Sequence, residues 1–244
     1  MQMQNINPFY TARCNPRPPR TPVYARLPLA PVTASRVPHL TSLYHNAVAG
    51  DYGDRGYPGN CGGNLIKDLL HYFQPKNVAD PMAGSGTCRD VCEELGIPCT
   101  SFDIHQGFDA CDPLGFSTPE RFDFIWAHPP YFRQKLYSLD PRDLSRAKSL
   151  DDFLNRYNQF LRNCAEALAP QGKLAILMGE YTDSKAGFLP LVYHTKRLAF
   201  AAGLRQHCTD IVRFSHGASS SKKVYRSVFI PGLHDVCCIF EPGD

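Results

Sequence analysis

Residues 80–87 read Asp80-Pro81-Met82-Ala83-Gly84-Ser85-Gly86-Thr87. A short apolar run, residues 77–79, precedes this glycine turn, and a helical pattern that stops at Gly96 follows it. Glycines in such a turn let the backbone approach a ligand closely, because they carry no Cβ. The stretch therefore predicts a strand, a turn able to hold a ligand and a helix in succession.

Helical and strand patterns alternate on both sides of this turn. The predicted helices cover residues 64–73, 87–95, 149 to a turn at 170–172, and 189–202. The predicted strands cover residues 77–79, 101–104, 122–127, 174–178, 207–214 and 235–240, with a further short element ending near residues 109–112. This alternation predicts an α/β fold with a doubly wound, mostly parallel sheet, whose ligands bind outside the carboxyl ends of the strands.

The first forty residues differ from the rest of the chain. They hold eight prolines, five arginines and no acid, which leaves 21 basic and 23 acidic side chains in residues 41–244. We therefore predict an extended arm over residues 1–40 and one domain over residues 41–244. The arm is interpreted equally well as a phosphate tether or as a packing strap.

Composition narrows the class of protein. The ten cysteines form no Cys-x-x-Cys pair, which favours a reducing, cytoplasmic setting over disulfides or a bound metal. No apolar stretch reaches the length of a membrane helix, and the first residues lack the pattern of a signal peptide. We expect no membrane partner and no metal.

The glycine turn does not match two common phosphate-binding motifs. A P-loop requires lysine where Gly86 stands, and the dinucleotide fingerprint requires glycine where Arg89 stands. The carboxylate of Asp80 suits an ammonium group, and the helix N-terminal amides beyond Gly84 suit a carboxylate. An amino-acid zwitterion satisfies both, as in S-adenosylmethionine.

Acidic residues also follow the next predicted elements. Asp103 lies where it can accept hydrogen bonds from ribose hydroxyls, and Asp112 where it can accept from an adenine amine. The alternative interpretation is that these acids only cap helices and turns.

A second cluster, His128-Pro129-Pro130-Tyr131, follows the strand predicted for residues 122–127. Together with residues 80–87 it resembles the two motifs of amino-group DNA methyltransferases, Asp-Pro-Phe-x-Gly-Ser-Gly-Thr and Asp/Asn/Ser-Pro-Pro-Tyr. The turn and helix of residues 59–73 resemble the segment that precedes the cofactor strand in that family. The resemblance spans residue 57 to the C-terminus and departs from the family at His128.

The resemblance implies a seven-stranded sheet with an antiparallel last strand, and methyl transfer from S-adenosylmethionine to adenine N6 or cytosine N4 in DNA, as in restriction-modification. The implied cofactor-binding residues are Asp80, Pro81, Met82, Ala83, Gly84, Ser85, Gly86, Thr87, Asp103, Asp112, Asn60 and Cys61. The implied catalytic residues are His128, Pro129, Pro130 and Tyr131.

The catalytic loop must accept hydrogens from a poorly nucleophilic amine. A neutral His128 imidazole and a carbonyl of the Pro129-Pro130 segment could supply the acceptors, and Tyr131 a face for an extruded base. Carbon-5 methylation is disfavoured because this loop contains no cysteine. An altered first motif residue is also compatible with an inactive site.

Five residues are candidates for nucleic-acid contacts: Phe132, Arg133, Lys222, Lys223 and Arg226. The three basic residues near the C-terminus lie beside a run of serines and could contact phosphates, although an ordinary solvated hairpin explains them as well. DNA is the expected partner. The alternatives are an RNA or protein-amide methyltransferase, and an inactive module that binds the cofactor and nucleic acid.

Overall fold

The computed structural model describes residues 32–45, 50–116, 118, 120–183, 185, 187–214, 230 and 232–243. The chain divides into two units, Met1–Val32 and Thr33–Asp244, and every described residue except Val32 belongs to the second. Most of the predicted arm therefore lies outside the described residues. Its last part packs on the domain, since Val37 is buried and His39 Nε2 lies 2.9 Å from Asp68 Oδ2.

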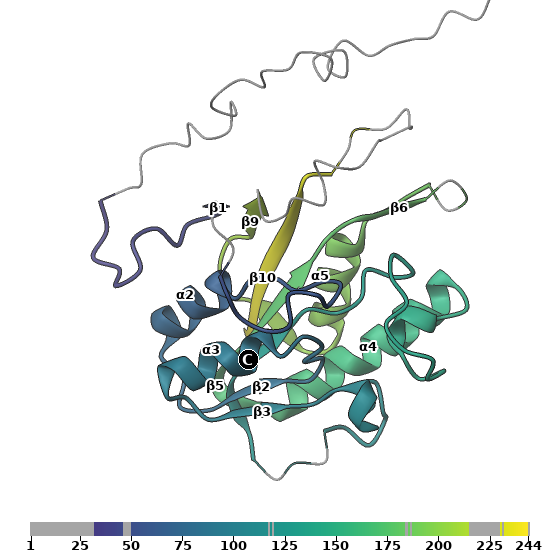
Figure 1. Ribbon diagram of the computed structural model, residues 1–244, viewed down its shortest axis with the longest axis horizontal. Coiled ribbons are helices and arrows are strands. Elements are labelled where there is room, and N and C mark those ends of the chain that lie inside the picture. The colour runs from purple at the N-terminus through teal and green to yellow at the C-terminus, as the bar shows by residue number, and fades with distance from the viewer. Residues whose placement is uncertain are drawn as a thin grey trace, which may run out of the picture. The chain divides into compact units, whose positions relative to one another are not determined.

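The second unit is a sheet between two layers of helices (Figure 1). The helices are α2 (Asn64–Phe73), α3 (Thr87–Leu95), α4 (Leu150–Ala167) and α5 (Leu191–Ala201), with 3₁₀ turns η3 (Ile104–Gln106) and η4 (Leu144–Arg146). The strands are β1 (Leu43–His45), β2 (Val78–Asp80), β3 (Cys99–Ser101), β4 (Phe122–Ala127), β5 (Leu168–Met178), β6 (Tyr181–Asp183), β7 (Gly187–Leu189), β8 (Leu204–Gln206), β9 (Ile211–Phe214) and β10 (His234–Pro242).

The main sheet has the order β1-β9-β10-β5-β4-β2-β3, with β8 paired to β10. Strands β3, β2, β4 and β5 are parallel, and β10 runs antiparallel to β5, β8 and β9. The doubly wound, mostly parallel sheet and its antiparallel last strand are confirmed. The described sheet has eight strands instead of the expected seven. The predicted strand at 109–112 is absent, whereas β1 joins one edge and β8, which precedes the segment predicted as 207–214, pairs with β10; only residues 211–214 of that segment form a strand, β9.

Alternate side chains of the central strands face opposite helix layers. Leu174 and Ile176 of β5 pack in the cluster that includes α4 and α5, whereas Ala175 and Leu177 pack in the cluster that includes α2 and α3. Both faces of β5 are thus covered, which explains its continuous apolar run.

The strand predicted at residues 101–104 lies earlier, as β3, and Ile104 begins η3 instead. Two further local predictions are wrong. No strand forms at residues 109–112, where turns occur instead, because Asn163 Nδ2 on α4 donates to the carbonyls of Ala110 and Asp112, at 2.9 and 2.8 Å. The turn expected at residues 170–172 is a bulge inside β5, since Phe122 pairs with Leu168 but Phe124 pairs with Lys173. No helix within the described ranges combines the length and apolar content that crossing a bilayer requires.

Candidate functional site

A pocket that is partly open to solvent lies at the carboxyl ends of β2, β3 and β4. Its walls include Tyr57, Cys61, Asp80, Pro81, Met82, Ala83, Gly84, Ser85, Thr87, Asp103, Phe108, Asp109, Trp126, His128, Pro130, Tyr137 and Arg142. The pocket thus joins the glycine turn to part of the second cluster, although the two are separated by forty residues of chain.

The glycine turn connects β2 to α3 and is tied to the end of β3. Gly84 has a φ of 47°, and its N–H donates to Asp103 Oδ2 at 2.8 Å. A Cβ at this position would lie 3.0 Å from Tyr57 Cε1, so the backbone approach requires glycine. On the other side, the Asp54 N–H donates to Ser85 O at 2.8 Å, so a loop closes over the start of the helix.

Asp80 is a buried acid at the end of β2. Its side chain is 3% exposed and accepts one hydrogen bond, from the Met82 N–H at 3.1 Å. Burial raises the pKa of Asp80 well above its usual value, and Cys99 and Asp103 act in the same direction. No ion pair joins Asp80 to a basic side chain in the described part of the chain. A cation in the pocket would compensate this carboxylate.

Asp103 follows β3 and caps the turn η3. Its Oδ2 accepts from Gly84 and its Oδ1 from the His105 N–H at 2.9 Å. A carboxylate has about four lone-pair sites, so Asp103 can hold the turn and still accept from a ligand hydroxyl.

Asp112 does not line the pocket. Its Oδ1 accepts from the Leu114 N–H at 2.9 Å, within a turn. The pocket wall here is Asp109, Ala110 and Cys111, with Asp109 Oδ1 accepting from the Cys111 N–H at 2.8 Å. The acid at this edge of the pocket is therefore Asp109 and not Asp112, because the segment forms turns rather than a strand.

Two more predicted cofactor residues are held in structural roles. Asn60 lies outside the wall; its Nδ2 donates to Tyr52 O at 2.9 Å and its Oδ1 accepts from Gly62 N. Gly86 is the N-cap of α3 and faces the Arg89 side chain. Cys61 does line the pocket, and its carbonyl accepts from Arg213 Nη1 at 2.9 Å.

His128 follows β4 and enters the pocket together with Pro130. Its Nε2 lies 2.9 Å from the Tyr131 hydroxyl. The Tyr131 ring packs on Gly179, where a Cβ would lie only 2.4 Å from its Cε2, and burial raises the pKa of Tyr131 well above its usual value. Neither Tyr131 nor Pro129 is part of the pocket wall. The expectation that Tyr131 offers a stacking face is wrong for this conformation, because its ring lies against the backbone.

Phe132 is a core residue. It is 5% exposed, has a φ of 53°, and meets Phe153 and Tyr181 edge-on at 5.6 and 5.3 Å. The prediction that Phe132 contacts nucleic acid is therefore wrong, because its ring is buried in the core. Arg133 is exposed, whereas Lys222, Lys223 and Arg226 lie outside the described residues.

No protein-family model matches the chain. A curated relative, the type II methyltransferase M.XhoI of Xanthomonas vasicola, is 38% identical over 72 residues, which are 28% of this chain and 13% of the relative. The chain thus spans a small part of the length of that enzyme.

Solved structures resemble the chain over part of its length. TrmN of Thermus thermophilus is 20% identical with a TM-score of 0.45, over 73% of this chain and 48% of its own. TTHA0409, also of Thermus thermophilus, provisionally a DNA modification methylase and complexed with S-adenosyl-L-methionine, is 20% identical with a TM-score of 0.41, over 56% and 54%. The 1,6-didemethyltoxoflavin-N1-methyltransferase of Burkholderia thailandensis is 16% identical with a TM-score of 0.46, over 74% and 78%.

Sequence reasoning missed the aromatic wall of the pocket. Tyr57 and Tyr137 stack with ring centroids 5.8 Å apart and planes 20° apart. Burial raises the pKa of the Tyr57 hydroxyl, and the negative charge of Asp103 raises it further. Both tyrosines come from irregular loops, so no periodic pattern marked them.

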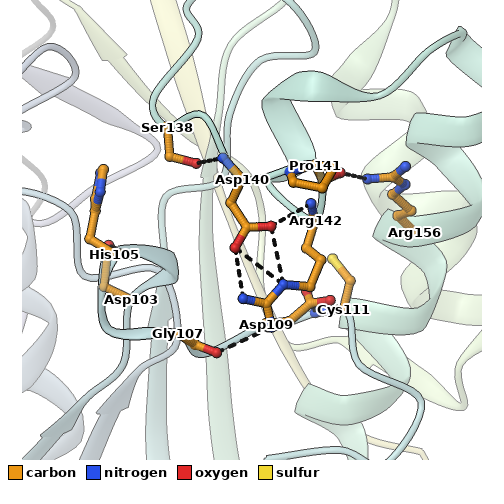
Figure 2. A network of polar contacts seen from close by, with 10 residues as sticks. All are labelled: Asp103, His105, Gly107, Asp109, Cys111, Ser138, Asp140, Pro141, Arg142 and Arg156. Carbon is orange, nitrogen blue, oxygen red and sulfur yellow. Dashed lines mark hydrogen bonds and ion pairs between the residues drawn. The ribbon is translucent and has the colours of Figure 1, made fainter.

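Arg142, another residue of the pocket wall, holds two loops together. Figure 2 shows its guanidinium against the Asp140 carboxylate, close to the segment that carries Asp109 and Cys111. Arg142 Nη2 lies 2.7 Å from Asp140 Oδ2, and its Nη1 donates to Gly107 O at 3.3 Å. Arg142 and Asp109 both line the pocket, and the Asp140 carboxylate holds the Arg142 side chain in place.

Proposed function

We propose that the chain is an S-adenosylmethionine-dependent methyltransferase that acts on an exocyclic amino group of a DNA base. The observation that carries the proposal is that Asp80, the glycine turn at 83–85 and His128 line one pocket. A cofactor cradle and an acceptor site must adjoin for a methyl group to pass directly between two ligands.

The pocket residues fit the cofactor in chemical type. Asp80 is an uncompensated buried carboxylate, which suits the α-ammonium group. Asp103 can accept from ribose hydroxyls beyond the two backbone N–H groups that it already holds. We assign the adenine amine to Asp109, in place of Asp112, with Phe108 as an apolar wall.

When bound, S-adenosylmethionine supplies an electrophilic methyl group on a sulfonium. The chain must make the acceptor amine more nucleophilic by accepting its hydrogen bonds. We assign His128 as one acceptor, positioned by the Tyr131 hydroxyl 2.9 Å from its Nε2. We assign the Pro130 carbonyl as the second acceptor: Pro130 lines the pocket, and its carbonyl oxygen, which accepts from the Phe132 N–H at 3.0 Å, has a second lone pair.

The choice of DNA rests on the motif pair, on the partial match to M.XhoI and on the five arginines of the first forty residues. RNA and protein amides present similar planar amines. Methyl transfer to RNA or to protein is therefore an alternative outcome of the labelling experiment.

The experiment is transfer of a labelled methyl group from S-adenosylmethionine to DNA, RNA and protein, with wild type and His128→Ala. We expect label in DNA, as methylated adenine or cytosine amine, and loss of transfer in the variant with little change in cofactor affinity. Label in RNA or protein alone would overturn the DNA assignment. Absence of label in every polymer, with cofactor still bound, would overturn the enzymatic proposal.

His128→Asn is an informative second variant, because asparagine occupies this position in part of the family that the motif resembles. Its amide oxygen can replace one imidazole acceptor. Transfer by His128→Asn but not by His128→Ala would support a hydrogen-bond acceptor role. Equal activity of both variants and wild type would show that the side chain at 128 takes no part.

A further inference from the structure

Three cysteines meet behind the glycine turn. Cys88 and Cys92 lie one turn apart on α3, and Cys99 begins the neighbouring strand β3. Their three sulfur atoms all lie within 4.8 Å of one another. Among the described residues this is the one group of three or more potential metal ligands that converges in this way. We call these residues the thiol trio.

The thiol trio is placed where a ligand can be enclosed without being sealed off. Cys88 and Cys92 are fully buried, whereas Cys99 is half-buried. All nine described cysteines are free, so none of the three is engaged in a disulfide. Ser101 Oγ lies 3.6 Å from Cys99 Sγ and can orient it by a hydrogen bond.

The spacing suits a thiophilic cation. A metal–sulfur bond of about 2.3 Å places sulfur atoms about 3.8 to 4 Å apart in tetrahedral or trigonal geometry. The three sulfur atoms lie within 4.8 Å of one another, so each pair would need to approach by about 1 Å at most to bind one ion. Rotation of the Cys99 side chain, the most exposed of the three, can supply this movement.

Charge favours a divalent ion over a monovalent one. Three thiolates with a divalent cation leave one net negative charge, whereas a monovalent cation leaves two, which is more costly in a buried site. Soft thiolate ligands select zinc-group ions over magnesium or calcium. The exposed side of Cys99 leaves room for a fourth ligand from solvent.

We propose that Cys88, Cys92 and Cys99 form a binding site for a divalent cation of the zinc group. This site departs from the sequence-based expectation of no metal, which relied on the absence of a Cys-x-x-Cys pair. It would tie the start of α3, next to the glycine turn, to β3, which leads into Asp103.

The test is titration of the full-length, reduced, metal-free protein with Cd(II) and Zn(II) in the presence of a competing chelator. We expect one ion per chain, with sulfur-to-cadmium charge-transfer absorption, and higher thermal stability when the ion is bound. Cys99→Ser should weaken the affinity roughly 100-fold or more, because it removes a ligand that binds the ion directly. The fold of the variant is checked by circular dichroism.

Cys164→Ser is the control, because Cys164 is a free thiol as buried as Cys88 and Cys92 but lies on α4, outside the trio. It should keep the wild-type affinity and absorption. Failure of wild type to bind, or equal affinity of wild type and Cys99→Ser, would overturn the proposal. The metal proposal would also be overturned if the reduced protein bound no metal and non-reducing mass spectrometry showed a disulfide to Cys99. Two of the three thiols would then form a redox pair. These measurements do not depend on methyl transfer.

Discussion

Asp80→Asn should make the ligand-free protein more stable while it weakens cofactor binding. The wild-type carboxylate is 3% exposed and accepts a single backbone hydrogen bond, at 3.1 Å from Met82 N. The asparagine oxygen can keep that bond, and its NH₂ group faces the pocket. The substitution therefore removes a poorly compensated buried charge with little change of shape.

The stability gain should depend on pH. Burial raises the pKa of folded Asp80 above its unfolded value, so the native state holds the proton more tightly and the free energy of unfolding falls as pH rises between the two values. The Asp80→Asn variant has no titratable group at this position, so its free energy of unfolding does not fall in this way. We expect a gain of about 0.5 to 2 kcal/mol at neutral pH, comparable with other stabilising substitutions, or about 1 to 8 °C in Tm. The gain should vanish below about pH 4, near the ordinary pKa of aspartate.

Binding should change in the opposite direction. Removing one partner of a buried charge pair costs about 2 to 5 kcal/mol, or about 30- to 5,000-fold in Kd for S-adenosylmethionine. In wild type the affinity should fall as pH falls through the raised pKa of Asp80, because protonation removes the carboxylate. The variant should lose this pH dependence.

The assays are thermal unfolding from pH 4 to 8 and calorimetric titration with S-adenosylmethionine. Asp143→Asn is the matched control: this acid is 4% exposed but accepts from Ser138 N at 2.7 Å and Ser145 N at 2.8 Å. It should lose about 1 to 3 kcal/mol, because an amide oxygen cannot replace both carboxylate oxygens. If Asp80→Asn destabilises the ligand-free protein, or binds the cofactor as wild type does, the role given to Asp80 is wrong.

Gly84→Ala should lower stability by about 1 kcal/mol and weaken cofactor binding, because the added Cβ would lie 3.0 Å from Tyr57. Gly107→Ala is the control: Gly107 also has a positive φ, but its added Cβ would meet no atom within 4 Å, so calorimetry should show an unchanged affinity for the cofactor. Phe132→Ala should cost about 3 to 5 kcal/mol in urea unfolding, and a near-neutral result would contradict its place in the core. Removal of residues 1–32 should reduce the slope of log affinity for DNA against log salt by about 0.9 for each arginine that contacts phosphate, and an unchanged slope would make the segment a packing strap.

Much of the fold followed from local patterns. The glycine turn and His128 each come directly after a buried apolar strand, and the structure places both at the same edge of the sheet. This outcome is general, because the carboxyl ends of neighbouring parallel strands meet at one edge. The order of elements followed from the alternation of helical and strand patterns, whereas the antiparallel last strand was expected from the family resemblance.

Contacts between distant segments decided the rest. Asp109 replaced Asp112 in the pocket wall because Asn163, fifty residues later, holds the intervening carbonyls. Phe132 turned inward because aromatic rings of α4 and β6 surround it. The thiol trio arose because α3 packs against β3, which brings Cys99 beside two thiols one helical turn apart. Sequence spacing determines which residues share a face of one element, but only packing determines which faces meet.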